Sequence, residues 1–211
     1  MALYHYCVLT KPEAPHSLAS DDAIDMENVD YKRQPDASEI AAQIESSNGL
    51  CCGVFRGGMF GLATNQIAVL SAWKTDEVGA ATMADLARQN KWPINAQENL
   101  TQTVRPLQPQ VIARRGIYVI RWIRLLARDI DEYTQLCLET WPRFEASTGS
   151  RCYGVFRPLE PSEVSKILML TWYATLTDWE ESRQLDPIDV PKWGRRSEME
   201  LSHWAQAGRL A

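Results

Sequence analysis

The sequence predicts an α+β protein built from two consecutive βαββαβ halves that pack sheet against sheet. The six residues CCGVFR at 51–56 return as CYGVFR at 152–157. The helix and strand signals on either side of this match also recur at nearly the same spacing, as expected for an internal repeat. A chain of 211 residues is long enough for two small halves. We therefore assign the first half to residues 1–108 and the second half to residues 109–211.

The first half shows the order strand, helix, strand, strand, helix, strand. Segments rich in β-branched and aromatic residues predict the strands. Ile40 and Ile44 lie four residues apart and predict a short helix that ends at Gly49. Thr75 and Asp76 are typical of the start of a second helix. The expected strands are residues 3–9, 51–56, 67–73 and 100–104.

The second half repeats this order with a stronger first helix. Asp129 is expected to cap this helix, Gly149 to end it, and Pro142 to kink it or end it early. Thr177 and Glu180 predict a capping box at the second helix. The apolar face of the first helix consists of Ile130, Tyr133, Cys137, Trp141 and Phe144. The expected strands are residues 117–123, 152–157, 167–173 and 201–205.

Each half is a ferredoxin-like unit whose sheet carries helices on one face only. The other face is apolar, so we expect the two sheets to cover each other as an internal α+β barrel pseudo-dimer with a cavity between them. Pro106 and Pro109 mark the junction of the halves. The first half carries a long insertion at 11–36, which is acidic at 21–30. This acidic loop is either a solvated surface segment or a lid over the barrel mouth that supplies a carboxylate base.

The composition excludes several classes of function. The net charge is −5 and no run of lysines and arginines exists, so a nucleic-acid partner is not expected. No apolar stretch is long enough to span a membrane. The first residues lack the basic and apolar segments of a signal peptide, which favours a cytoplasmic protein. The motifs of nucleotide, dinucleotide and zinc enzymes and of serine hydrolases are absent.

The cysteines, histidines and tryptophans limit the chemistry further. The five cysteines form no C-x-x-C pair, which indicates reduced, buried thiols, with one reactive thiol as the alternative. His5, His16 and His203 lie far apart, so neither a metal site nor a haem is predicted, and we expect no cofactor. Eight tryptophans against four phenylalanines indicate a pocket that stacks flat ligands or simply a bulky core.

The second half resembles the NIPSNAP family over residues 116–183. The resemblance rests on YVIRWI at 118–123, WPRFE at 141–145, GVF at 154–156 and LTWYATLTDWE at 170–180. That family belongs to the dimeric α+β barrel superfamily, so the resemblance implies a barrel fold and a homodimer. The superfamily includes cofactor-independent monooxygenases, isomerases and lyases that act on small, often aromatic molecules, and also haem enzymes.

Alternation along the strands groups the candidate site residues by face. Ser71 and Trp73 share one face, and Thr171 and Tyr173 share the matching face in the second half. We expect this face to line the barrel interior and the opposite Leu/Ala face to pack on the helices. Arg121 lies among apolar residues in mid-strand, where it could bind a carboxylate, phenolate or enolate. Alternatively, its strand lies at an edge in solvent, or Arg121 pairs with a structural carboxylate.

His5, Arg121 and Tyr173 are the predicted catalytic residues. His5 would act as the general base, and Tyr173 would donate a hydrogen bond or a proton. Each of these side chains, and each of the tryptophans, could instead be a satisfied core residue. The predicted substrate-binding residues are Trp73, Trp122, Ser71, Thr171 and His203.

The sequence thus favours a cofactor-independent enzyme that binds an apolar, aromatic substrate in the barrel cavity. A lyase or isomerase that works by proton transfer is the first hypothesis. A non-catalytic binding or interaction module is the alternative, and a cofactor-free or haem-dependent oxygenase is the third.

Overall fold

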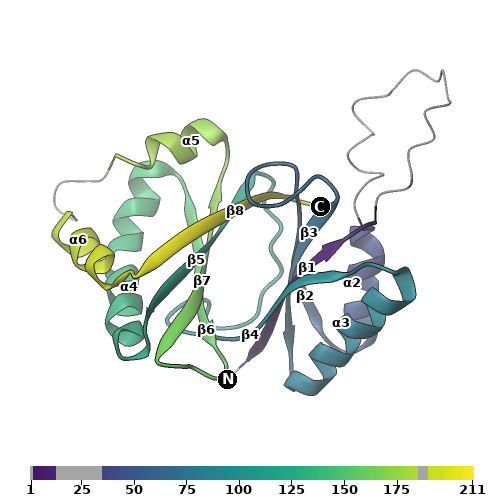
Figure 1. Ribbon diagram of the computed structural model, residues 1–211. Helices are drawn as coiled ribbons and strands as arrows, with labels where there is room; N and C mark the ends of the chain where they lie inside the picture. The colour runs from purple at the N-terminus through teal and green to yellow at the C-terminus, as the bar shows by residue number, and fades with distance from the viewer. Residues whose placement is uncertain (1, 13–34, 185–189) are drawn as a thin grey trace.

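Eight antiparallel strands close into one barrel in the order β1-β3-β2-β8-β5-β7-β6-β4 (Figure 1). The computed structural model describes residues 2–12, 35–184 and 190–211. The strands are β1 (Leu3–Thr10), β2 (Leu50–Arg56), β3 (Gln66–Trp73), β4 (Ile94–Gln102), β5 (Ile117–Leu126), β6 (Arg151–Pro158), β7 (Val164–Tyr173) and β8 (Ser202–Leu210). The helices are α2 (Ala37–Ser46), α3 (Asp76–Asn90), α4 (Ile130–Thr148), α5 (Leu176–Glu181) and α6 (Val190–Met199), with a 3₁₀ turn at Ala127–Asp129 before α4.

The two halves have the same internal strand order, which confirms the predicted repeat. The first half contributes β4-β1-β3-β2 and the second half contributes β8-β5-β7-β6. Two short seams join them. At one seam Phe55 and Arg56 of β2 pair with Leu210 and Arg209 of β8, and at the other β4 pairs with β6. The predicted α+β barrel pseudo-dimer is therefore the fold of this single chain.

Local sequence signals place most element ends. The Asp36 carboxylate accepts hydrogen bonds from the backbone N–H of Ser38 and Glu39 and so begins α2. Gly149 ends α4 in the left-handed conformation, at φ 66°, as predicted. The acidic segment 21–30 lies outside the described residues.

Four details of the sequence prediction are wrong. Of the two effects expected of Pro142, the early end is wrong, because helix α4 continues to Thr148. The capping box of α5 joins Thr175 to Asp178, two residues before the expected position. Strand β4 begins six residues early, at Ile94. Helix α6 was not expected between β7 and β8; the segment is mostly polar and contains a glycine, although its few apolar residues share one helix face.

Side chains from both halves fill the barrel interior. Aromatic rings meet across the two sheets, with ring centroids 4.8 Å apart for Tyr4 and Phe156 and 5.1 Å apart for Tyr6 and Trp122. The linker between the halves, residues 103–116, closes one end of the barrel. There the Ile112 N–H donates to the Cys52 carbonyl oxygen at 2.7 Å. Between these side chains lies a cavity of about 10 Å³, which is the room that about one water needs. This cavity is far smaller than the one that the predicted aromatic substrate would need.

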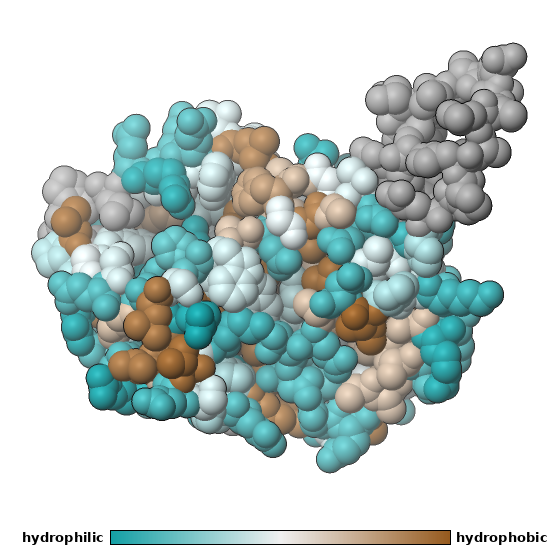
Figure 2. All heavy atoms as spheres, viewed as in Figure 1, coloured by the Kyte–Doolittle hydropathy of each residue, from teal (hydrophilic) through white to brown (hydrophobic). Residues whose placement is uncertain are grey.

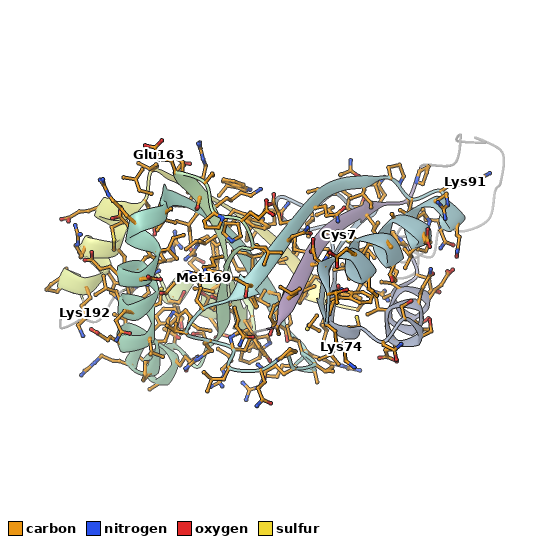
Figure 3. All side chains as sticks on the ribbon, turned by 90° about the horizontal axis from the view of Figure 1, so that it is seen from below. Cys7, Lys74, Lys91, Glu163, Met169 and Lys192 are labelled. Atoms are coloured by element: carbon orange, nitrogen blue, oxygen red, sulfur yellow. The ribbon has the colours of Figure 1, made fainter. Side chains whose placement is uncertain are left out.

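A second pair of cores lies outside the barrel, between each half-sheet and its helices. Helices α2 and α3 cover the first half and α4 covers the second, and Cys7 and Met169 lie in these two layers (Figure 3). Leu70 belongs to the barrel interior, whereas Trp73 packs under the helices. The predicted face assignment is therefore wrong. Both faces of β3 and β7 are buried and mainly apolar, so alternation separates the faces without telling which layer each one enters.

The burial of the cysteines agrees with what the composition predicts. All five cysteines are free and buried, which confirms the expectation of reduced, buried thiols. Among the described residues no helix combines the length and the apolar character that crossing a membrane requires. On the face shown in Figure 2, hydrophobic side chains form separate groups among hydrophilic ones.

Candidate functional site

Three of the predicted site residues lie together under helix α3. His5 of β1 stands directly opposite Ser71 of β3 in the strand register, and the rings of His5 and Trp73 meet edge to face at 6.4 Å. Trp73 Nε1 donates a hydrogen bond to Ser71 Oγ at 2.8 Å. These side chains point toward the helices and not into the barrel. The predicted grouping of His5, Ser71 and Trp73 is therefore present in the outer layer of the first half.

Helix α3 brings a carboxylate to His5. Asp76, the first residue of α3, places Oδ1 2.9 Å from His5 Nε2, although the ring N–H is not aligned for a hydrogen bond. Asn99 of β4, which stands opposite His5 in the register, donates from Nδ2 to Asp76 Oδ2 at 3.0 Å. Strands β1, β3 and β4 and helix α3 thus converge on one polar cluster.

Several polar atoms of this cluster are buried without a hydrogen-bond partner among the described residues. They are His5 Nδ1 and Nε2, Asp76 Oδ1 and Asn99 Oδ1. Such atoms are rare in folded proteins and carry a desolvation penalty, so they are typical of places where a polar molecule binds or a proton moves. We infer that this cluster is a candidate place for ligand binding or proton transfer, in addition to its packing in the core.

Burial keeps the His5 ring neutral. The side chain is only 1% exposed, and this burial lowers the pKa of His5, while the Asp76 carboxylate opposes the shift. A neutral imidazole can accept a proton, and a carboxylate at 2.9 Å stabilises the imidazolium that results. The pair can therefore take up one proton.

A surface cleft gives access to the Asp76 side of the pair. The cleft has a volume of about 420 Å³ and is lined by Asp76, Gln97, Glu98, Asn99, Pro158, Leu159 and Glu160. The Asp76 side chain is 32% exposed, so it can touch a molecule in the cleft, whereas His5 lies behind it. The lining is polar and acidic, although Lys166 forms an ion pair with Glu98.

Arg121, Thr171 and Tyr173 form a second group, in the outer layer of the second half. Strand β5 lies between β7 and β8, so the alternative that Arg121 sits on an edge strand is excluded. Arg121 is half-buried. Burial raises the pKa of Tyr173, while a hydrogen bond to Ser182 and the Arg121 charge act in the opposite direction. Arg121 stands opposite Met169 and Tyr173 opposite Ile117, so the two predicted catalytic residues lie four positions apart along the paired strands β5 and β7. They belong to a different layer from His5.

The remaining two predicted residues lie apart from both groups. Trp122 faces the barrel interior, where Trp122 Nε1 and the Tyr6 hydroxyl both donate to Gln206 Oε1, at 3.3 and 2.7 Å. His203 is exposed and pairs with Glu200 at 2.8 Å. The predicted site residues therefore lie in four places: the helix-facing layer of the first half, that of the second half, the barrel interior and the surface.

The register shows which positions of the two halves are equivalent. Leu3 stands opposite Trp73 in the first half, and Ile117 stands opposite Tyr173 in the second. Counting on by two residues, His5 corresponds to Val119. Counting on by four, Cys7 corresponds to Arg121. His5 and Arg121 therefore each have a residue of a different type at the equivalent position of the other half, whereas Ser71 and Trp73 occupy the positions of Thr171 and Tyr173.

The sequence reasoning missed Asp76 and Asn99. The sequence identifies Asp76 only as part of a helix start, and no spacing or motif pairs it with a residue on β1. The strand register could have found it, because β1 and β3 run antiparallel and a helix that follows Trp73 begins beside the start of β1. A third missed residue is Arg196 of α6, which is buried and donates from Nη2 to the Tyr133 hydroxyl at 2.9 Å.

Comparisons with solved structures agree on the fold. An anthrone oxidase-like protein matches with a TM-score of 0.64 and 11% identity, over 100% of this chain and 91% of the other. A mutant chlorite dismutase from Candidatus Nitrospira defluvii matches at 0.61 and 8%, with the same coverages. A protein proposed to be a monooxygenase, from Fusobacterium nucleatum, matches at 0.58 and 6%, over 99% and 92%. No protein-family model and no curated protein sequence matches the chain. At these identities the likeness shows the dimeric α+β barrel fold alone.

A haem does not fit at His5. A Cβ on Gly79 would lie 2.7 Å from His5 Nε2, so helix α3 leaves no space for a macrocycle at that nitrogen. The chemistry proposed for His5 therefore involves no haem.

Proposed function

We propose that the protein is an enzyme that acts on a small, polar molecule by proton transfer at the Asp76–His5 pair. The observation that carries this proposal is a buried histidine 2.9 Å from a carboxylate that reaches an open cleft. Asp76 would take a proton from a C–H or O–H group of the substrate, and His5 behind it would share or store that proton. The acidic lining favours a neutral or cationic substrate over an anionic one.

The reaction class that fits this pair is a lyase or isomerase step. Both begin with removal of a proton next to a group that stabilises the resulting anion. A cofactor-free oxygenase is the alternative within the same chemistry, since it also starts from a deprotonated substrate. The names of the fold neighbours, an oxidase-like protein and a proposed monooxygenase, support that alternative by analogy. The NIPSNAP resemblance, the homodimer and a cytoplasmic location remain parts of this proposal.

Solvent deuterium tests the proton-transfer step without knowledge of the product. A panel of small ketones, phenols and amines would be incubated in D₂O with the wild-type protein, and deuterium uptake at carbon would be followed by NMR. We expect exchange in at least one compound, reduced about 10²- to 10⁴-fold by Asp76→Asn. Asp85→Asn is the matched control, because Asp85 is exposed on the same helix and pairs with Arg88.

Oxygen uptake measured with the same panel separates the two reaction classes. Consumption of O₂ that depends on Asp76 would favour the oxygenase, and exchange without O₂ uptake would favour the lyase or isomerase. Equal exchange by wild type and Asp76→Asn would show that the pair is not the catalytic centre.

A non-catalytic binding module is the second candidate, and the packed barrel favours it. The interior cavity of about 10 Å³ cannot hold the substrate that a barrel enzyme would bind. Absence of exchange and of O₂ uptake across the panel, together with a binding isotherm for one of its compounds, would support this candidate.

A further inference from the structure

The cleft beside Asp76 lies at the β4–β6 seam, and its lining narrows the class of substrate. Strand β4 contributes residues 97–99, the end of β6 and the turn after it contribute residues 158–160, and α3 contributes Asp76. The backbone N–H of Leu159 donates to the Asn99 carbonyl oxygen at 2.9 Å, so the two strand segments are fixed relative to each other. The volume of about 420 Å³ is enough for a small organic molecule.

The charged side chains in this lining are carboxylates. Asp76, Glu98 and Glu160 line the cleft, and no described lining residue is a lysine or arginine. Lys166 neutralises Glu98 in an ion pair, whereas Glu160 is exposed and forms no ion pair with a residue that the structure describes. Burial lowers the pKa of His5 behind Asp76, so that ring supplies no fixed positive charge at neutral pH. The cleft therefore keeps a negative charge that attracts cations.

The cluster behind the cleft lacks hydrogen-bond donors. Asn99 Nδ2 donates to Asp76 Oδ2 at 3.0 Å, while Asn99 Oδ1 and Asp76 Oδ1 accept no hydrogen bond from any described residue. The His5 ring, only 1% exposed, directs Nε2 at Asp76 Oδ1 from behind, but its N–H is not aligned to donate. This buried, unpartnered histidine distinguishes the cleft from a solvated acidic surface. A protonated amine, with its several N–H donors, complements such a set of acceptors.

Proton removal by the Asp76–His5 pair also requires stabilisation of the anion that results. The lining contains no cationic side chain for this purpose, and the nearby Lys166 is held by Glu98. The start of α3 carries a partial positive charge, but Asp76 and Glu77 already occupy its first turn. A positive charge on the substrate itself would supply the stabilisation, because an ammonium group beside the reacting atom favours the deprotonated form.

The apolar part of the lining consists of Pro158 and Leu159. We propose that the substrate of this cleft is a small organic cation, with a protonated amine next to the group that loses the proton and an apolar body against these two residues. This inference rests on the function proposed for the Asp76–His5 pair. It adds the charge and the chemical class of the molecule on which the pair acts.

Three probes of similar shape test the charge of the ligand. Benzylamine, benzyl alcohol and benzoate share an apolar ring, and ligand-observed NMR measures their dissociation constants. We expect benzylamine to bind the wild-type protein about tenfold or more tightly than benzyl alcohol, and benzoate not to bind. Asp76→Asn should weaken benzylamine about tenfold, and Glu160→Gln about two- to fivefold because Glu160 is exposed. Asp85→Asn, on the exposed face of α3, is the control of equal charge change.

Equal binding of benzylamine and benzyl alcohol, or an equal loss of benzylamine binding in Asp85→Asn, would overturn the inference. Circular dichroism checks the fold of each variant. If Asp76→Asn does not fold, Glu160→Gln and the comparison of the three probes on the wild type still decide the question.

The exchange experiment in D₂O separates this inference from the proposed function. Deuterium exchange of uncharged ketones without selective binding of benzylamine would leave the proton-transfer function in place and overturn the cationic substrate. Selective binding of benzylamine without exchange in any compound of the panel would overturn proton transfer, and the cleft would then be a cation-binding site alone. Exchange together with selective binding, both reduced in Asp76→Asn, is the result expected if both hold.

Discussion

Gly79 lies where helix α3 crosses His5, and its replacement by alanine tests the packing of the candidate site. A Cβ at this position would lie 2.7 Å from His5 Nε2 and 2.8 Å from Trp73 Cδ1. Ordinary contacts begin at 3.4 Å, so the helix or the His5 ring must move by about 0.7 Å. Gly194 of α6 is the matched control, because a Cβ there would meet no atom within 4 Å.

The two variants are expected to shift stability in opposite directions. Alanine is favoured over glycine in a helix by up to about 1 kcal/mol at either position. At Gly79 the overpacking costs about 1–3 kcal/mol and outweighs this gain. Gly79→Ala should therefore unfold more easily than wild type, by up to about 2 kcal/mol, while Gly194→Ala should be slightly more stable.

Urea denaturation followed by circular dichroism measures the difference in unfolding free energy. In a thermal scan the two variants should differ by about 2–12 °C in Tm, since 1 kcal/mol shifts Tm by about 2–4 °C for a chain of this length. If Gly79→Ala were stabilised as much as Gly194→Ala, then α3 would not press on His5. The site geometry would then need revision.

Two further predictions concern the titration of buried groups. Burial lowers the pKa of His5, so the unfolded state binds this proton more readily. The unfolding free energy should then fall as pH drops below about 6.5, by up to about 1.4 kcal/mol per pH unit. Urea midpoints between pH 5 and 8 should show a shallower decline in His5→Gln than in the wild type, and an equally steep decline in both would refute the assignment to His5. Burial also raises the pKa of the Cys51 thiol to about 11 and that of Cys7 to about 12. Ellman's reagent should therefore label no cysteine of the native protein and all five in urea; fast labelling of any native thiol would refute the packing around it.

The internal repeat was the main basis of the fold prediction. The match of 51–56 with 152–157 and the signals around it indicated the βαββαβ order of each half. The barrel was predicted because the two apolar sheet faces must be covered. What alternation could not decide was which face of β3 and β7 enters the barrel. Leu70 faces inward and Trp73 faces outward, although both are hydrophobic. Only the closure of the strands into a barrel resolves this choice.

Sequence reasoning placed His5, Ser71 and Trp73 in one site, and the structure brings these three side chains together because β1 and β3 pair directly. Their role in catalysis or binding stays a prediction. The sequence did not point to Asp76, which enters from the start of α3. Its position depends on how the helix crosses the sheet, and no spacing in the sequence encodes that crossing.

The layered fold explains why the two halves differ where they do. The barrel interior is shared, so a substitution on either half must fit side chains of the other, as Tyr6 does against Trp122. The helix-facing layers are separate, since Cys7 packs under α2 and α3 while its equivalent, Arg121, stands opposite Met169 in the layer under α4. A change in one such layer leaves the other untouched. Polar residues can therefore enter one half alone. The His5–Asp76 pair and Arg121 each occupy a layer of this kind.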